Sequence, residues 1–382
     1  MSFRLDGADS AENFLPAADA EAAAARHLCF AEKRKAETVI LFGLGDGQLA
    51  QTIAQKKPHA LELIICDLFP AHVRKLIENH LTIIDSEKNT RVLTDSSIWS
   101  ILLLLRHERK AENCHLILNP DLTGKSKDDH RTLQRIFSGL KTAELPTVNN
   151  YPTISAGAIL SPDEPGLNEF IAALPGWLKE ISIVWDCPQN YSFPQLIHPD
   201  GVQINSMCHP LDADFGAQRN RMLKNCSGEW VVYLDADERL DASNWDSLRR
   251  AASLSGCEGW YLPRETCYPD ENHVRVGYGL WPDLQLRFFR NTGRLRFVNR
   301  IHERIEGLSG PSGILPGVSI IHLTHLLKSR ERIEAKLESF NLAAGGAFCH
   351  RLGAEFPNVH RDILCPEQTD PVHAVILPEF NL

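Results

Sequence analysis

Short apolar runs alternate with amphipathic stretches along the first third of the chain. Runs such as Thr38–Phe42 are apolar at successive positions, which is typical of strands buried on both faces. The runs predict strands at Thr38–Phe42, Leu61–Cys66, Arg91–Thr94 and His115–Asn119. Helices are predicted at Ala17–Phe30, Gly47–Gln55, Ala71–His80 and Ser97–Arg106. This alternation predicts a Rossmann-like domain, in which helices cover both faces of a parallel sheet.

A second alternation follows Pro146–Pro152, a Pro- and Asn-containing segment that is typical of a linker. Strands are predicted at Ile154–Leu160, Ile181–Trp185, Val202–Asn205, Trp230–Leu234, Gly259–Pro263, Leu284–Arg290 and Val318–His322. Helices are predicted at Leu167–Leu178, Phe215–Asn225, Asn244–Ser255 and Ser329–Phe340. The predicted organisation is therefore a Rossmann-like domain at 1–148, a second α/β domain at 149–341, and an irregular tail at 342–382 that packs on the body.

Length and composition agree with two soluble domains. A chain of 382 residues is longer than a typical domain with one hydrophobic core. Of its residues, 43% are apolar and 23% are charged, as in soluble globular proteins. Acidic residues outnumber basic ones by 49 to 40, so the chain lacks the positive charge that binding to a nucleic-acid backbone requires. We therefore expect no nucleic-acid partner.

The sequence also bears on where the protein is expected to reside in the cell. The first thirty residues carry several acids, which excludes the basic-then-apolar order of a secretory signal. The longest apolar stretch, Ile98–Leu105, is far shorter than the ~20 residues of a membrane span. The ten cysteines form no CxxC pair, so we expect reduced thiols and not a zinc ribbon. These features predict a cytoplasmic protein whose membrane association, if any, is peripheral.

Two aspartates follow directly on the predicted strand Trp230–Leu234, in the run "GEWVVYLDADERL". Strand alternation would send Asp235 and Asp237 to one side and Ala236 to the other. Carboxylates at the carboxyl edge of an α/β sheet suit a hard divalent cation such as Mg²⁺ or Mn²⁺ and the phosphates that it binds. The alternative interpretation is a strand that ends in a solvated acidic turn.

Three ordered blocks place this motif in a wider pattern. The stretch Asp214–Glu238 resembles family 2 glycosyltransferases of the GT-A fold, in which an "F..ARN.....A.GDWIL.LDADE" run is typical. "WPDLQLRFFRNTGRLRFVNRIHERI", Trp281–Ile305, and the later "GVSIIHLTH" resemble a subgroup that includes lipopolysaccharide-core and peptide S-glycosyltransferases. The resemblance covers Thr153 to about Asn341. It implies a GT-A-type nucleotide-diphospho-sugar transferase domain that uses a nucleotide-sugar as its donor.

The resemblance also implies roles for individual residues. Asp235 and Asp237 match the metal and sugar-nucleotide motif, with Asp237 as the direct metal ligand, and His322 matches a late histidine that completes the metal shell. Asp214 and Arg219 match the positions that hold the ribose-phosphate side of the donor.

For the catalytic base, Asp283 matches the acidic position that takes the acceptor's proton. Pro282 replaces the usual Glu before it, which makes Glu303 of the His302-Glu303 pair a competing base. His302 would then position the acceptor or the donor. The alternative interpretations are an ordinary turn residue for Asp283 and a surface ion pair for His302-Glu303.

Two loops depart from the family pattern. "KNEE" after the first strand is replaced by Ser161-Pro162-Asp163-Glu164, and "DTGSTD" after the second strand is replaced by "DCPQNY". Of the latter loop, which contacts the base and ribose in the family, only Asp186 is retained. These changes put the donor's identity and the transfer reaction itself in question.

A glycine-rich loop lies in the first domain. "VILFGLGDGQLAQTIA" places Gly43, Gly45 and Gly47 between a predicted strand and helix, and Asp67 ends the next strand. Such a loop suits a methyltransferase or a dinucleotide fold equally well, and Asp67 is at the distance where an acid can accept hydrogen bonds from ribose hydroxyls. The alternative interpretation is a Rossmann scaffold without a cofactor. Val39–Leu49, with Asn119-Pro120, also resembles the Rossmann-like part of motility-associated factor proteins, which are linked to flagellin glycosylation.

Three functions remain open from the sequence. The first is a metal-dependent inverting glycosyltransferase that acts on a cell-surface polysaccharide, lipopolysaccharide or protein, so that its acceptor is a glycan, a lipid-linked molecule or a protein. The second is a methyltransferase-like enzyme whose active part is the N-terminal domain. The third is a non-catalytic sugar-nucleotide-binding or assembly protein.

Overall fold

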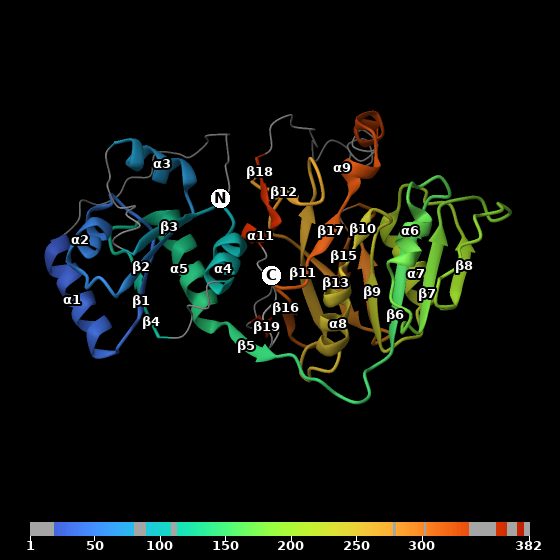
Figure 1. Ribbon diagram of the computed structural model, residues 1–382, viewed down its shortest axis with the longest axis horizontal. Helices are drawn as coiled ribbons and strands as arrows, with labels where there is room; N and C mark the ends of the chain where they lie inside the picture. The colour runs from blue at the N-terminus through green and yellow to red at the C-terminus, as the bar shows by residue number, and fades with distance from the viewer. Residues whose placement is uncertain are drawn as a thin grey trace. The chain divides into compact units, whose positions relative to one another are not determined.

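The computed structural model describes residues 19–79, 89–107, 113–277, 280–301, 303–335, 357–364 and 373–377. The chain divides into two compact units (Figure 1). The N-terminal unit comprises Met1–Leu140 and Val276–Pro282, and the C-terminal unit comprises Lys141–Arg275 and Asp283–Leu382. The division falls before the predicted linker because β5 (Lys141–Glu144) pairs with a strand of the C-terminal unit.

The N-terminal unit contains a parallel four-stranded sheet in the order β3-β2-β1-β4. Its strands are β1 (Thr38–Phe42), β2 (Glu62–Asp67), β3 (Thr90–Thr94) and β4 (Cys114–Leu118). Its helices are α1 (Ala20–Lys33), α2 (Gln48–Lys56), α3 (Pro70–Glu78), α4 (Ile98–His107) and α5 (Gly124–Gly139). Val39 and Leu41 pack with α1 and α2, whereas Ile40 and Phe42 pack with α4 and α5. Helices therefore cover both faces of this sheet (Figure 1).

The helix α5 is absent from the sequence prediction. Its apolar residues are confined to its last two turns, at Leu133, Ile136 and Phe137, and its first half is polar. All three are buried against the sheet, together with His130. Tertiary packing, and not a continuous apolar stripe, holds this helix in place.

The C-terminal unit contains a mixed eleven-stranded sheet in the order β5-β19-β16-β11-β13-β9-β6-β7-β8, with β10 and β17 paired beside this path. Four strands form a parallel group: β6 (Ile154–Leu160), β7 (Glu180–Trp185), β8 (Ile204–Cys208) and β9 (Trp230–Tyr233). The strands that continue the sheet are β10 (Glu238–Arg239), β11 (Gly259–Thr266), β13 (Asp283–Arg290), β16 (Ser312–Ile314), β17 (Ile320–His322) and β19 (His373–Ile376). Two further hairpin-like pairs join β12 (His273–Arg275) to β18 (Asn358–His360), and β14 (Arg296–Val298) to β15 (Arg304–Glu306).

Helices cover the parallel group on its two faces (Figure 1). These helices are α6 (Leu167–Ala172), α7 (Phe215–Lys224) and α8 (Ala242–Ala251), and the short helices α9 (Thr324–Leu327) and α11 (Arg361–Leu364) lie elsewhere. Trp230 of β9 packs into the larger core, with its ring 4.8 Å from that of Phe288. Val231 faces the other side, where Met222 of α7 packs. β9 is thus fixed from both faces, and the loop that follows it starts from a rigid strand.

Some predicted boundaries differ from the structure. The predicted helix Leu167–Leu178 ends at Ala172, because Pro175 cannot continue a helix. In the predicted tail, β18 and β19 pair with strands of the C-terminal unit, so these described parts are not irregular. Within the described residues, no helix is both long and apolar enough to cross a bilayer.

Candidate functional site

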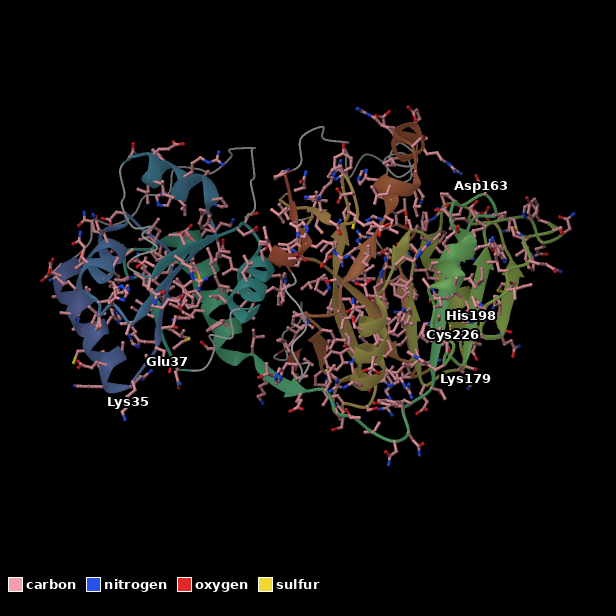
Figure 2. All side chains as sticks on the ribbon, viewed as in Figure 1. Lys35, Glu37, Asp163, Lys179, His198 and Cys226 are labelled. Carbon is pink, nitrogen blue, oxygen red and sulfur yellow. The ribbon has the colours of Figure 1, made fainter. Side chains whose placement is uncertain are left out.

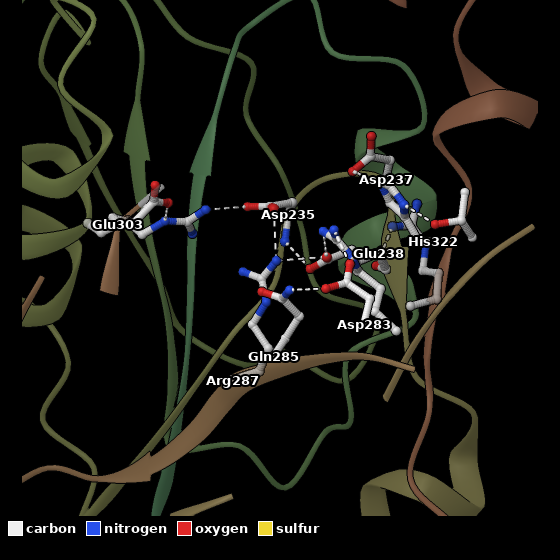
Figure 3. A network of polar contacts seen from close by, with 12 residues as sticks. Asp235, Asp237, Glu238, Asp283, Gln285, Arg287, Glu303 and His322 are labelled. Carbon is white, nitrogen blue, oxygen red and sulfur yellow. Dashed lines mark hydrogen bonds and ion pairs between the residues drawn. The ribbon is translucent and has the colours of Figure 1, made fainter. Parts of the chain in front are cut away.

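A turn follows β9 and carries the Asp235-Ala236-Asp237 motif to the carboxyl edge of the parallel strands. The Glu238 N–H donates to the Asp235 carbonyl at 2.9 Å, which closes the turn. Ala236 is buried in the core. Because strand geometry ends at Tyr233, the alternation expected for Asp235 and Asp237 does not continue, and the two carboxylates bind different cationic side chains (Figure 3).

Two buried arginines hold the Asp235 carboxylate. Arg219 of α7 donates from Nη2 to Oδ1 at 3.0 Å, and Arg287 of β13 donates from Nη2 to Oδ2 at 3.1 Å. Both guanidinium groups lie over the Tyr233 ring, at 4.7 and 4.5 Å from its centroid. Burial favours the neutral form of Arg219, yet Asp235 and Glu303 raise the pKa of Arg219 above its ordinary value. The arginines are therefore fixed positive charges.

The two arginines connect further carboxylates into one network (Figure 3). Arg219 donates from Nε to Glu303, and Arg287 donates to Glu238 Oε1 at 2.8 Å. Glu238 is fully buried, and burial raises its pKa although Arg287 opposes that shift. Glu238 also accepts the Asp235 N–H at 3.0 Å, so it fixes the turn as well as the arginine.

Asp283, a predicted base, starts β13 and lies at the end of the same network. Its Oδ2 accepts from Arg264 Nε at 2.8 Å, and its Oδ1 accepts from Gln285 Nε2 at 2.6 Å. About a quarter of its side chain is exposed. Its Oδ1 accepts one hydrogen bond and keeps a second lone pair that could take a proton from an acceptor.

Asp237 has a different partner. Lys328, at the end of α9, donates from Nζ to Asp237 Oδ2 at 2.8 Å and lies 2.5 Å from Glu164 Oε1. His322 of β17 places Nε2 at 3.8 Å from Asp237 Oδ1, and its Nδ1 lies 3.2 Å from Thr266 Oγ1. Asp237 and its neighbours thus form a compact group in which one cation, Lys328, bridges two carboxylates.

As arranged, these side chains do not fit a divalent metal. Both oxygens of Asp235 are bound to guanidinium groups, and Lys328 takes one oxygen of Asp237. In the described parts of the chain, no three His, Cys, Asp or Glu side chains gather as a ligand set. The metal role of Asp235, Asp237 and His322 stays a prediction, and the structure supplies other cations at the same carboxylates.

The remaining predicted residues flank the network. Asp214 caps α7 by accepting the Ala217 N–H at 2.8 Å, and the Arg300 guanidinium lies 3.8 Å from it. Asp186, after β7, accepts the Leu211 N–H at 2.8 Å through Oδ1, and its side chain is exposed. Their donor-binding roles stay predictions. His302 lies outside the described residues.

Sequence reasoning missed Arg264, Gln285 and Lys328. Arg264 and Gln285 contact Asp283, and Lys328 contacts Asp237. Each is a single polar residue without a motif of its own. The burial of Lys328, whose side chain is only 8% exposed, becomes visible only after the chain folds.

Side chains of the N-terminal unit itself hold its glycine-rich loop in place. Asp67 accepts the Leu44 N–H at 2.7 Å and the Phe69 N–H at 2.8 Å, one at each carboxylate oxygen, and is 2% exposed. A Cβ added to Gly45 would lie 2.7 Å from Asn119 Nδ2, so Asn119 fills the space beside the loop. The carboxylate expected to bind a ribose therefore serves the protein's own backbone.

Comparisons with known proteins give short or distant matches. No protein-family model matches the chain. A TPR repeat-containing protein of Synechococcus elongatus is 30% identical over 93 residues, which are 24% of this chain and 21% of that protein. The chain thus spans about a fifth of that relative.

Solved structures similar to this chain include Staphylococcus aureus TarS. TarS 1-349 gives a TM-score of 0.31 at 11% identity, covering 51% of this chain and 65% of that one. Its complex with UDP-GlcNAc gives a TM-score of 0.31 at 12% identity, covering 51% and 66%. Its complex with UDP gives a TM-score of 0.30 at 11% identity, covering 51% and 65%. This chain therefore spans less than two thirds of those chains.

Proposed function

We propose that the C-terminal unit is a glycosyltransferase that transfers a sugar from a nucleotide-sugar donor to a glycan, lipid-linked or protein acceptor. One observation carries the proposal. Residues from separate blocks that resemble family 2 glycosyltransferases meet in one network, with Arg219 and Asp235 from the first block and Asp283, Arg287 and Glu303 from the second. A chance resemblance would not require these blocks to meet.

The position of the network suits a ligand with phosphate groups. It lies beyond the carboxyl ends of parallel strands, where α/β proteins bind their ligands. Arg219 Nη1 and Arg287 Nε and Nη1 are buried and have no hydrogen-bond partner among the described residues. Buried guanidinium donors require an acceptor, and phosphate oxygens match their geometry.

The network also supplies groups for an inverting transfer. The acceptor oxygen would bond to the sugar's anomeric carbon, while the bond from that carbon to the donor phosphate breaks and the nucleoside diphosphate departs. A carboxylate must take the acceptor's proton, and Asp283 and Glu303 are the candidates. Arg219 and Arg287 would stabilise the negative charge that develops on the departing diphosphate.

The dependence on Mg²⁺ or Mn²⁺ stays a prediction, which the Mg²⁺, Mn²⁺ and EDTA arms of the donor assay test. Such an ion could bind at Asp237 and His322 only by displacing Lys328, which the present pairing of Asp237 with Lys328 does not favour.

The experiment is a donor assay with wild-type protein. Nucleotide-sugars, beginning with UDP-GlcNAc, are incubated with protein in Mg²⁺, in Mn²⁺ and in EDTA, and the released nucleoside diphosphate is quantified. We expect release with at least one donor. Arg219→Gln should abolish it, whereas Arg221→Gln should retain it, because Arg221 of the same helix pairs with Gln218 and not with the carboxylates of the network. Absence of release with every donor and every candidate acceptor would contradict transfer.

A second candidate function is binding of a sugar nucleotide without transfer. It is favoured by the pairing of Asp283 with Arg264 and Gln285, which engages both carboxylate oxygens. Calorimetric binding of a nucleotide-sugar, together with no release of nucleoside diphosphate, would select this function. The structure does not favour a methyltransferase-like N-terminal unit, because Asp67 is committed to backbone N–H groups.

A further inference from the structure

Lys328 is fixed beside the Asp235-Ala236-Asp237 turn by backbone pairing. β17 pairs with β10, so that His322 lies opposite Glu238, and it also pairs with β11. The Leu323 N–H then donates to the Asp237 carbonyl at 2.7 Å. α9 follows directly and ends next to Lys328. The lysine thus approaches Asp237 from a segment that is hydrogen-bonded to the turn itself.

The lysine bridges carboxylates from the ends of two neighbouring strands. Asp237 follows β9 and Glu164 follows β6, and these strands pair in parallel. The Lys328 ammonium lies 2.8 Å from Asp237 Oδ2 and 2.5 Å from Glu164 Oε1. The side chains of Asp237 and Lys328 are 5% and 8% exposed. One buried cation between two carboxylates offsets one of their two negative charges without any added ion.

An ammonium group and a divalent cation cannot share this place. Both need the oxygens of Asp237, and two like charges a few ångströms apart in a buried site repel each other strongly. The Lys328 ammonium lies within contact distance of both carboxylates, so it occupies the space that an ion at Asp237 would need. The His322 imidazole, 3.8 Å from Asp237, could approach an ion bound there only if the ammonium left.

We propose that the Lys328 ammonium takes the place of a divalent metal at Asp237. This exclusion of the metal follows from the contacts of Lys328 and is independent of the proposed glycosyltransferase function. If that function holds as well, nucleotide-sugar binding would proceed in EDTA.

The test uses Mn²⁺ alone with the full chain, so it is independent of any nucleotide. Electron paramagnetic resonance of free Mn²⁺ measures how much ion the protein removes from solution. Wild-type protein should show no binding that depends on Asp237. Lys328→Met should bind one Mn²⁺ at least ~10-fold more tightly than wild type, because a unit charge next to the site is removed. Adding Asp237→Asn to that variant should abolish the gain.

Two controls keep the test interpretable. Lys179→Met removes an exposed lysine at the opposite end of the strands from Asp163, as Figure 2 shows, and should bind Mn²⁺ as wild type does. Lys328→Gln replaces the ammonium by a neutral donor, so it provides a second variant should Lys328→Met unfold. Tryptophan fluorescence confirms folding of each. Mn²⁺ binding by wild type that Asp237→Asn removes would overturn the proposal, as would the absence of any gain in both folded Lys328 variants.

Discussion

The two units contain the same arrangement of four parallel strands. They differ in the groups that lie at the carboxyl edge of those strands. In each, the first strand along the chain lies between the second and the fourth, as β3-β2-β1-β4 and as β8-β7-β6-β9. In the N-terminal unit, Asp67 at this edge accepts hydrogen bonds from two backbone N–H groups. In the C-terminal unit it carries side-chain ion pairs centred on Asp235, whose side chain is 32% exposed.

The difference shows that strand order alone does not make a site. A carboxylate bound to backbone N–H groups, such as Asp67, holds a loop that cannot rearrange without losing those bonds. A carboxylate bound to arginine and lysine side chains can exchange partners when an anion arrives. We therefore assign a scaffold role to the N-terminal edge and chemistry to the C-terminal edge, since function depends on the residues that a fold presents.

The largest expected effect separates the two candidate bases within the C-terminal edge. Asp283→Asn should lower turnover of the proposed transfer by ~10²–10⁴ with nearly unchanged donor binding, because a base contributes in the transition state. Glu303→Gln should give a smaller loss, dominated by weaker acceptor binding. Steady-state kinetics and donor calorimetry measure both. The reverse pattern would assign the base to Glu303, and near-normal turnover in both variants would contradict a carboxylate base at these positions.

Arg287→Met tests whether the ion pairs of the C-terminal edge are structural as well. It would leave the fully buried Glu238 without its closest cation. Breaking a buried pair in this way should lower the free energy of unfolding by about 3–5 kcal/mol. Urea unfolding followed by tryptophan fluorescence reports on this unit, which contains most of the tryptophans. Arg290→Met, an exposed change on the same strand, should have little effect, and equal stability of both variants would contradict the account.

Asp67→Asn is the corresponding test of the N-terminal edge. An amide keeps one acceptor oxygen but not two, so one buried backbone N–H would lose its partner. The expected loss of stability is about 1–3 kcal/mol. Circular dichroism during denaturation measures it, with Asp128→Asn on the exposed face of α5 as the control. An unchanged midpoint would mean that Asp67 does not hold the glycine-rich loop.

A smaller effect is expected on the stability of the fold at acidic pH. Burial, with the nearby Arg275 guanidinium, lowers the pKa of His325 to about 4, although Asp237 opposes the shift. The unfolded chain would protonate His325 near pH 6.5 while the folded chain resists until about pH 4. His325 therefore lowers stability as pH falls through this window and has no such effect above it.

Replacing that histidine should flatten the pH profile. His325→Gln should remove a loss of the order of 1 kcal/mol between about pH 6.5 and 4, a value reduced for partial exposure of the side chain. His360→Gln, at an exposed position, serves as the control. Parallel stability profiles for wild type and His325→Gln would contradict the neutral, half-buried state of His325.

Much of the secondary structure followed from the sequence because its signals are local. β1 matches the predicted strand at Thr38–Phe42, and β6 matches Ile154–Leu160. α5 could not be predicted from periodicity, because its buried residues include the polar Ser126 and His130. β19 could not be predicted from the sequence either, because its four residues lie in a Pro-containing tail and form a strand only by pairing with β5 and β16.

For the site, the sequence located carboxylates but not their partners. Asp235, Asp283 and Glu303 stand in recognisable blocks, and the structure brings all three into one network. The pairing of Asp283 with Arg264, and that of Asp237 with Lys328, depends on contacts between residues that are far apart in the chain. The common facing of Asp235 and Asp237 was expected from strand alternation, which ends at Tyr233 because a turn follows.

The central claim is that the chain's chemistry resides at the C-terminal edge and not at the glycine-rich loop. Its most direct test is release of nucleoside diphosphate from nucleotide-sugars by two matched variants, Asp235→Asn and Asp67→Asn, at a temperature where both remain folded. The account predicts that Asp235→Asn abolishes release, that Asp67→Asn retains it, and that excess S-adenosylmethionine or NAD leaves the melting temperature unchanged. Retained release in Asp235→Asn with loss in Asp67→Asn, or clear stabilisation by either adenine cofactor, would contradict it.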